Sequence, residues 1–230
     1  MNQGAQVLTP AGGGALAAQR NRVLRNTYWL LALSMVPTVL GAWIGVQTGI
    51  SQAMSPGIGL VVFLAGAFGF MFAIERTKNS AAGVPLLLAF TFFMGLMLAR
   101  LLGVVLGLSN GTGLVMTAFA GTGIIFFGMA TMSTVVKRDL TQMGKFLFIG
   151  MIMLLVAMIA NFFIQSGPLM ITLSVLAIGI FSLFILHDLK RIVDGGETNY
   201  ISATLALYLD LFNVFQALLA LLGIAGGERD

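Results

Sequence analysis

Long apolar runs, separated by short polar connectors, dominate the pattern of this chain. A helix needs about 20 apolar residues to span the hydrocarbon of a bilayer, so the runs predict seven membrane-spanning helices. They cover residues 27–47, 57–75, 81–99, 114–136, 146–165, 169–188 and 201–224. The connectors hold helix-breaking residues, in Ser55-Pro56-Gly57, Ser109-Asn110-Gly111, Ser166-Gly167-Pro168 and Asp194-Gly195-Gly196. We therefore expect an all-α integral membrane protein built as a seven-transmembrane-helix bundle.

The same pattern divides the chain into three parts. Residues 1–24 are rich in Gly, Ala and Gln and have no apolar core of their own, so we expect a disordered N-terminal tail in the cytoplasm. Residues 25–226 form the transmembrane domain, and residues 227–230 a short C-terminal tail. Within the spans, Gly41/Gly45 and Gly103/Gly107 have the GxxxG spacing that allows close helix packing.

Composition supports a membrane protein and excludes several kinds of site. The chain is 58% hydrophobic and only 9% charged, whereas soluble domains carry about 25% charged residues. Its net charge of +4 is spread in short clusters, which indicates membrane topology and no nucleic-acid partner. The absence of cysteine excludes disulfides and thiolate chemistry, and the single histidine, His187, excludes a multi-His metal centre.

The basic residues predict the orientation. Ten of the twelve lie in the N-terminal segment and in alternate loops: Arg20, Arg22, Arg25, Arg76, Lys78, Lys137, Arg138, Lys145, Lys190 and Arg191. The positive-inside rule therefore places the N-terminus in the cytoplasm and the C-terminus outside. Arg100 and Arg229 fall on the other side. We interpret Arg100 as a side chain that reaches the outer interface, with a pore-lining role as the alternative.

The last span carries an acid near its middle. A carboxylate at this depth costs ~2.5–3.5 kcal/mol on insertion scales, so Asp210 needs a partner or a function. Its helix face is small or polar throughout, with Ala203, Ala206, Asp210, Asn213, Ala217 and Ala220. Such a face packs against other helices, which predicts that this span turns inward. Asp210 and Asn213 either only join helices by hydrogen bonds or form part of a functional site.

A second acid, Asp188, closes the preceding span. Beside His187 and ahead of Lys190 and Arg191, it is either an ordinary interfacial acid or a partner that faces Asp210. Two facing carboxylates in a low-dielectric site share a proton, and a cation can replace that proton. His187 would add pH sensitivity near neutrality. Arg76, or the bases Lys190 and Arg191, could pair with one of the two carboxylates in an alternative state.

Calcium binding at Asp188 and Asp210 would be weak. Calcium prefers six to eight oxygen ligands, more than two carboxylates and Asn213 supply. We therefore expect no tightly held cofactor, and a site that suits a conduction pathway or a pH gate.

The last third contains three specific motifs, Leu186-His187-Asp188-Leu189, Gly195-Gly196-Glu197-Thr198-Asn199-Tyr200-Ile201 and Leu207-Tyr208-Leu209-Asp210-Leu211-Phe212-Asn213. These motifs resemble those of the Bax inhibitor family, the transmembrane Bax-inhibitor-motif proteins, and in particular its bacterial YccA-like branch. Three further stretches agree, namely Leu24-Arg25-Asn26-Thr27-Tyr28, Lys137-Arg138-Asp139-Leu140-Thr141 and Ala160-Asn161-Phe162-Phe163. The resemblance covers residues ~22–225 and implies a seven-helix bundle with the last helix at its centre.

The resemblance implies two activities. Members with both acids are described as pH-sensitive calcium leak proteins, in which two aspartates share a proton and an arginine of the second span pairs with one of them. Asp188 and Asp210 match those acids, and Arg76 is the candidate arginine. The YccA-like branch is instead associated with modulation of the membrane-anchored protease FtsH, and its best-known member lacks both acids.

We therefore predict a pH-sensitive calcium leak channel of the bacterial inner membrane, gated by proton sharing between Asp188 and Asp210. The alternative is a modulator of FtsH without ion conduction. An enzyme is not expected, because an intramembrane aspartyl protease carries Gly-x-Gly-Asp at one acid, whereas Leu207-Tyr208-Leu209 precedes Asp210. No internal repeat indicates a secondary transporter. The expected partners are the lipid bilayer, calcium or other cations, and FtsH.

Overall fold

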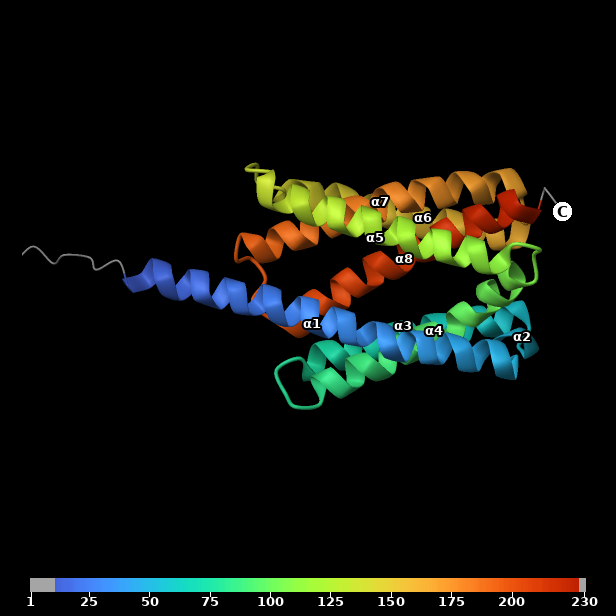
Figure 1. Ribbon diagram of the computed structural model, residues 1–230, viewed down its shortest axis with the longest axis horizontal. Helices are drawn as coiled ribbons and strands as arrows, with labels where there is room; N and C mark the ends of the chain where they lie inside the picture. Colours follow the sequence, from blue (N-terminus) through green and yellow to red (C-terminus); the bar gives the residue numbers. More distant parts are fainter. Residues whose placement is uncertain (1–10, 228–230) are drawn as a thin grey trace, which may run out of the picture.

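The computed structural model describes residues 11–227, which form helices joined by short connections (Figure 1). The helices are α1 (Ala11–Thr48), α2 (Ile50–Ala53), α3 (Pro56–Thr77), α4 (Gly83–Leu106), α5 (Gly111–Val135), α6 (Thr141–Ile164), α7 (Gly167–Val193) and α8 (Tyr200–Gly227). Within the described residues, seven helices, all except α2, are long and apolar enough to cross a membrane. The seven-span, all-α prediction is confirmed.

The helix boundaries follow from local chemistry. Ser55 and Ser166 cap α3 and α7, where their hydroxyl oxygens accept the amides of Ile58 at 3.5 Å and Leu169 at 3.4 Å. Proline follows each capping serine within the first two helical positions, where its missing N–H costs nothing. Gln165, with a φ of 55°, ends α6 in the left-handed conformation.

The start of α1 differs from the sequence prediction. The helix begins at Ala11 and its span at Leu16, so residues 11–24, which composition placed in a disordered tail, are helical. Alanine, glutamine and arginine all favour helix, and this segment simply continues the helix of the first span. Residues 1–10 and the last three residues of the predicted C-terminal tail lie outside the described part of the chain.

Helix α8 lies at the centre of the bundle, as the sequence predicted (Figure 1). It contacts α1, α3, α4, α5 and α7. Buried positions occur on every side of it, because Leu207, Tyr208, Val214 and Leu219 are buried together with most of the small-residue face. This helix is therefore enclosed by protein, and its polar groups lie within the bundle.

Helices α1 and α4 approach each other closely, and glycine makes this approach possible. A Cβ on Gly41 would lie 2.2 Å from the carbonyl oxygen of Phe92, and one on Gly95 would lie 2.1 Å from that of Thr38. No side chain larger than hydrogen fits at these distances. Gly45, the second member of the predicted GxxxG pair, packs in the same way against Ala99.

The two ends of the bundle differ in charge. The α3–α4, α5–α6 and α7–α8 connections lie at the same end as the N-terminal part of α1 (Figure 1). We call this the basic end, because ten basic residues lie there: Arg20, Arg22, Arg25, Arg76, Lys78, Lys137, Arg138, Lys145, Lys190 and Arg191. At the opposite end, Arg100 donates a hydrogen bond to the carbonyl oxygen of Met54 at 3.3 Å. Arg100 thus ties α4 to the connection that follows α2.

Candidate functional site

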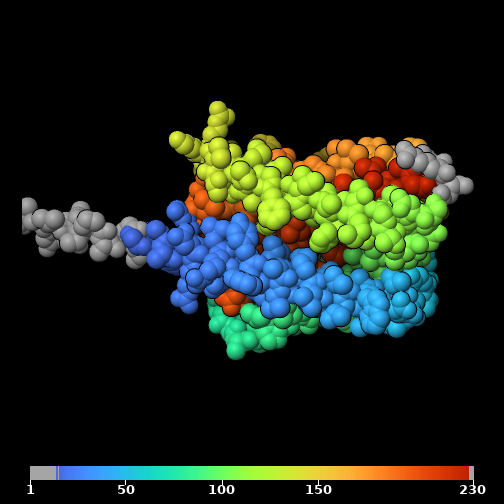
Figure 2. Space-filling view, viewed as in Figure 1, coloured from blue at the N-terminus to red at the C-terminus, as the bar shows by residue number. Residues whose placement is uncertain are grey.

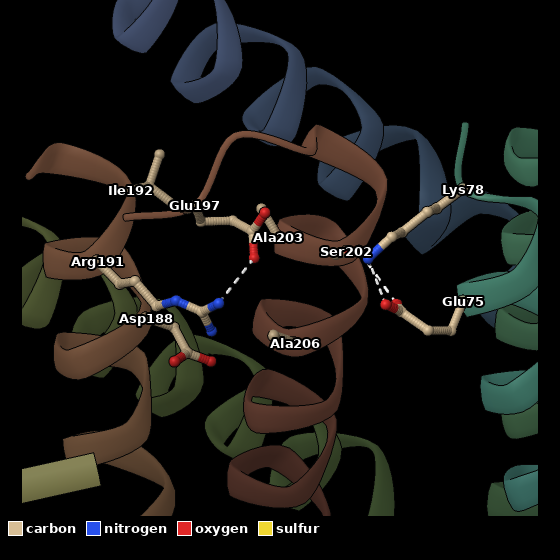
Figure 3. Close-up of a pocket in the computed structure, with 9 residues that line it drawn as sticks. All are labelled: Glu75, Lys78, Asp188, Arg191, Ile192, Glu197, Ser202, Ala203 and Ala206. Carbon is tan, nitrogen blue, oxygen red and sulfur yellow. Dashed lines mark hydrogen bonds and ion pairs between the residues drawn. The ribbon is translucent and has the colours of Figure 1, made fainter. Parts of the chain in front are cut away.

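A polar cavity of about 230 Å³ opens at the basic end, between α3, α7 and α8 (Figure 3). Charged side chains of both signs line it, together with a few small or apolar residues. They are Glu75, Lys78, Asp188, Arg191, Ile192, Glu197, Ser202, Ala203 and Ala206. Its lining residues from α7 and α8 lie near the end of α7 and the start of α8.

The α7–α8 connection forms one wall of this cavity and has a defined turn. Gly195 has a φ of 82°, a left-handed conformation that glycine adopts without strain. The next amide, of Gly196, donates to the carbonyl oxygen of Arg191 at 2.8 Å. Glu197 then accepts the amides of Thr198 and Asn199 at 2.9 Å each through Oε1. Its Oε2 lies 3.3 Å from Nη2 of Arg191 (Figure 3). The glycine-glycine-glutamate sequence thus folds the connection back over the end of α7.

Asn199 caps α8 and also joins two connections. Its Oδ1 accepts the amides of Ile201 at 2.9 Å and Ser202 at 3.2 Å, as an N-cap residue does. Its Nδ2 donates to the carbonyl oxygen of Lys78 at 3.2 Å and to Oδ1 of Asn79 at 2.8 Å. The start of α8 is therefore held against the α3–α4 connection.

The opposite wall of the cavity comes from the end of α3. Glu75 forms an ion pair with Lys78, and its Oε2 accepts the hydroxyl of Ser202 at 3.3 Å (Figure 3). The cavity is thus bordered by two ion pairs, Glu75–Lys78 and Glu197–Arg191. Each joins an acid to a base that lies near it in the chain.

Asp188 extends from α7 toward α8 at the cavity (Figure 3). Its side chain is 17% exposed, and its Oδ1 lies 2.8 Å from Nδ1 of His187. The imidazole packs against α6, where a Cβ on Gly144 would lie only 2.5 Å from Nε2. A glycine of α6 thus makes room for the ring that contacts the acid.

Asp210 lies on α8 and is only 6% exposed. Its Oδ2 is buried and has no hydrogen-bond partner. Asp188 is near enough to interact with it electrostatically, but the hydrogen bonds of the described residues include none between the two side chains. The structure therefore places Asp188 and Asp210 close enough for electrostatic interaction and leaves Oδ2 of Asp210 without a hydrogen-bond partner. A buried oxygen without a partner is costly and often marks a functional group.

Two other predicted site residues lie apart from the cavity. The amide of Asn213 donates to the carbonyl oxygen of Leu209 in its own helix at 2.8 Å. Arg76 is exposed, and its guanidinium lies over the ring of Phe72, 5.0 Å from the centroid. Neither residue lines the cavity, and Asp210 and His187 are not among its lining residues either, so Asp188 is the predicted site residue that reaches it. The base that reaches this site is Lys78, two residues closer to the loop and just past the end of α3.

Sequence reasoning missed several lining residues, although the chain contained signals for two of them. Ser202, Ala206 and Asp210 are spaced four residues apart and so share a helix face. The hydroxyl of Ser202 therefore lies on the same face as Asp210, about two turns nearer the start of α8. Glu197 belongs to a motif that carried the family resemblance. No comparable signal identified Glu75, because its helix carries no polar face that would show which way it turns.

A resident metal is not indicated by these side chains. Within residues 11–227, no group of three or more His, Asp or Glu side chains could hold a metal ion.

Comparison with known proteins shows similarity along nearly the whole chain. A family model described as "Inhibitor of apoptosis-promoting Bax1" matches residues 20–227. The "Modulator of FtsH protease YccA" of Escherichia coli K12 is 37% identical over 208 residues, which are 90% of this chain and 92% of that protein. The corresponding protein of another E. coli strain is called "Inner membrane protein YccA". An uncharacterised protein of Pseudomonas aeruginosa is 37% identical over 217 residues, covering 93% and 95% of the two chains.

Proposed function

Because the chain belongs to the Bax inhibitor family, we propose that it modulates an FtsH-type protease in the bacterial inner membrane. The observation that carries this proposal is the 37% identity to the FtsH modulator over 90% of this chain and 92% of the relative. The family model matches residues 20–227, so the likeness to the family extends over all seven helices that are long enough to span a membrane. The positive-inside rule then places the basic end, with its ordered connections, in the cytoplasm.

The test is a reconstitution with the FtsH of the same cell. The full-length protein should co-purify with FtsH, and the rate at which FtsH degrades a membrane-bound substrate should change when both are in one proteoliposome. An unrelated seven-helix protein at the same protein-to-lipid ratio is the control. Failure to co-purify, together with an unchanged degradation rate, would contradict the proposal.

A second candidate function is pH-dependent conduction of a cation, with calcium as the expected cargo. The unpartnered Oδ2 of Asp210 favours it, because a buried oxygen beside a second acid can accept a proton or a passing cation. Protonation removes the repulsion between Asp188 and Asp210. Loss of the proton restores that repulsion, which a cation or a separation of α7 from α8 would relieve.

The surroundings of the two acids support a gate at the basic end. His187 contacts Asp188, and the cavity beside it holds the bases Lys78 and Arg191 with the acids Glu75 and Glu197. Both bases are engaged in ion pairs with these acids. Neither base is bonded to Asp188, so among the described residues the imidazole of His187 is the one direct partner of this acid at the cavity.

Calcium flux into proteoliposomes at two pH values tests this second function. Asp210→Asn should abolish the pH dependence of the flux. Asp194→Asn is the matched control, because Asp194, which follows α7, is 48% exposed and forms an ion pair with Lys190 at 2.5 Å, whereas Asp210 is buried and its Oδ2 has no hydrogen-bond partner. A pH profile of Asp210→Asn identical to wild type, or no flux above empty liposomes, would rule out the second function while leaving the first intact.

A further inference from the structure

We propose that α1 carries a binding site for the headgroup of an anionic phospholipid, formed by Arg25, Tyr28, Trp29 and Ala32. These residues line a shallow, open hollow on the surface that is separate from the polar cavity. Their spacing of i, i+3, i+4 and i+7 places them on one face of the helix. Two of them, Arg25 and Tyr28, belong to a sequence motif to which the proposed functions assign no role.

The position of this face along α1 fits the membrane boundary. The span Leu16–Thr48 has 33 residues, although about 20 suffice to cross the hydrocarbon. Counting about 20 residues back from Thr48 reaches Tyr28 and Trp29. The N-terminal part of α1 therefore projects beyond the bundle (Figure 2), and Arg25 lies at headgroup level with the aromatic residues just below it.

The chemistry of the hollow fits a lipid phosphate. Arg25 is exposed, and no ion pair or side-chain hydrogen bond of the described residues uses it. A guanidinium offers two parallel N–H groups to a phosphate. Trp29 is 74% exposed, and tryptophan at a membrane interface places its ring among the headgroups and its N–H toward polar atoms.

The neighbouring side chains provide a wall and a floor for the lipid. The Tyr28 ring packs edge-on against Phe126 of α5, with 6.1 Å between centroids, which holds it upright beside the hollow. Ala32 is exposed and small, so an acyl chain can lie against the helix one turn below the aromatic pair. The unpaired positive charge of Arg25 favours an anionic lipid over a zwitterionic one.

The chain offers a direct probe, because it contains only two tryptophans. Trp43→Phe leaves Trp29 as the single fluorophore. Its fluorescence is measured in phosphatidylcholine proteoliposomes that contain either brominated phosphatidylglycerol or brominated phosphatidylcholine as quencher. We expect an association constant about fivefold higher for the anionic lipid, the effect of about one basic side chain near a membrane surface.

Arg25→Gln in that background should bring the two association constants close to each other. Arg20→Gln removes the same charge about 140° around the helix and should leave the preference unchanged. Equal quenching by the two lipids in the parent, or an equal loss in Arg20→Gln, would overturn the site. So would the same preference at Trp43, which is 61% exposed and is read in a Trp29→Phe variant.

Discussion

The side-chain amide of Asn199 lies 2.8 Å from Oδ1 of Asn79, which joins two connections that are 120 residues apart in the chain. The same side chain caps α8 through its oxygen. One residue therefore sets where the central helix begins and anchors it to the α3–α4 connection.

Asn199→Ala should lower the free energy of unfolding by about 1–2 kcal/mol, because it removes a helix cap and two cross-connection hydrogen bonds. Denaturant unfolding in detergent micelles measures the change. Asn199→Asp keeps the acceptor that caps α8 but loses both donated hydrogen bonds, so its free energy of unfolding should lie between those of wild type and Asn199→Ala. If Asn199→Asp is as stable as wild type, the bonds to the α3–α4 connection contribute nothing.

Gly95→Ala should destabilise the α1–α4 pair by about 1–3 kcal/mol, the usual cost of overpacking. The added methyl would meet the carbonyl oxygen of Thr38 at 2.1 Å, so two helix backbones must separate. Gly128→Ala is the control, because a Cβ there has nothing within 4 Å and alanine favours helix by about 0.5–1 kcal/mol. The same unfolding assay should give changes of opposite sign, and equal signs would contradict the close approach.

Gly144→Ala should also be destabilising, but through His187. The methyl would lie 2.5 Å from Nε2 of the imidazole, so the ring must leave Asp188 or α6 must move. In a His187→Ala background the same substitution should become stabilising, because the clash is gone and the helix preference of alanine remains. Additive effects in this double-mutant cycle would show that the ring is not packed against Gly144.

The pKa of Asp139, which precedes α6 outside the membrane-spanning segments, should respond to Thr141. The hydroxyl of Thr141 donates to Oδ1 at 2.6 Å and its amide at 2.8 Å, and these bonds hold the pKa of Asp139 below its ordinary value. A lowered folded-state pKa gives stability that is present above the unfolded pKa and is lost as pH falls through the folded one. Thr141→Val should raise the pKa toward its ordinary value in a ¹³C NMR titration of the carboxylates. An unchanged titration would mean that the hydroxyl contributes nothing.

The seven spans and the inward face of the last helix could be predicted because bilayer thickness limits the length of apolar segments and close helix packing selects small residues. The central position of that helix was implied by the family resemblance. The predicted 169–188 and the observed Gly167–Val193 differ mainly at the polar end. There Lys190 and Arg191 fall outside an apolar window, although their helix continues. Helical hydrogen bonding continues past the last apolar residue, so apolar segments underestimate the length of helices at membrane boundaries.

The candidate site was predictable only in part. Asp188 and Asp210 could be found because buried acids are costly and both lie on apolar helices. Which basic residue lines the cavity beside Asp188 depends on the rotation of α3, where Arg76 lies over Phe72 and Lys78 forms an ion pair with Glu75 at the cavity. That rotation is decided by contacts with α4 and α8, which no local pattern contains.

The enclosure of α8 has a consequence for biosynthesis. This helix leaves the ribosome after α1–α7, yet the hydroxyl of its Tyr208 lies 2.9 Å from Oγ1 of Thr38 and 3.3 Å from the carbonyl oxygen of Thr91. Until α8 is inserted, the central space that it fills is empty, and the hydroxyl of Thr38 and the carbonyl oxygen of Thr91 lack their hydrogen bonds to Tyr208. A chain interrupted before residue 200 would therefore present that open centre to lipid, which distinguishes an unfinished copy from a finished one within the membrane.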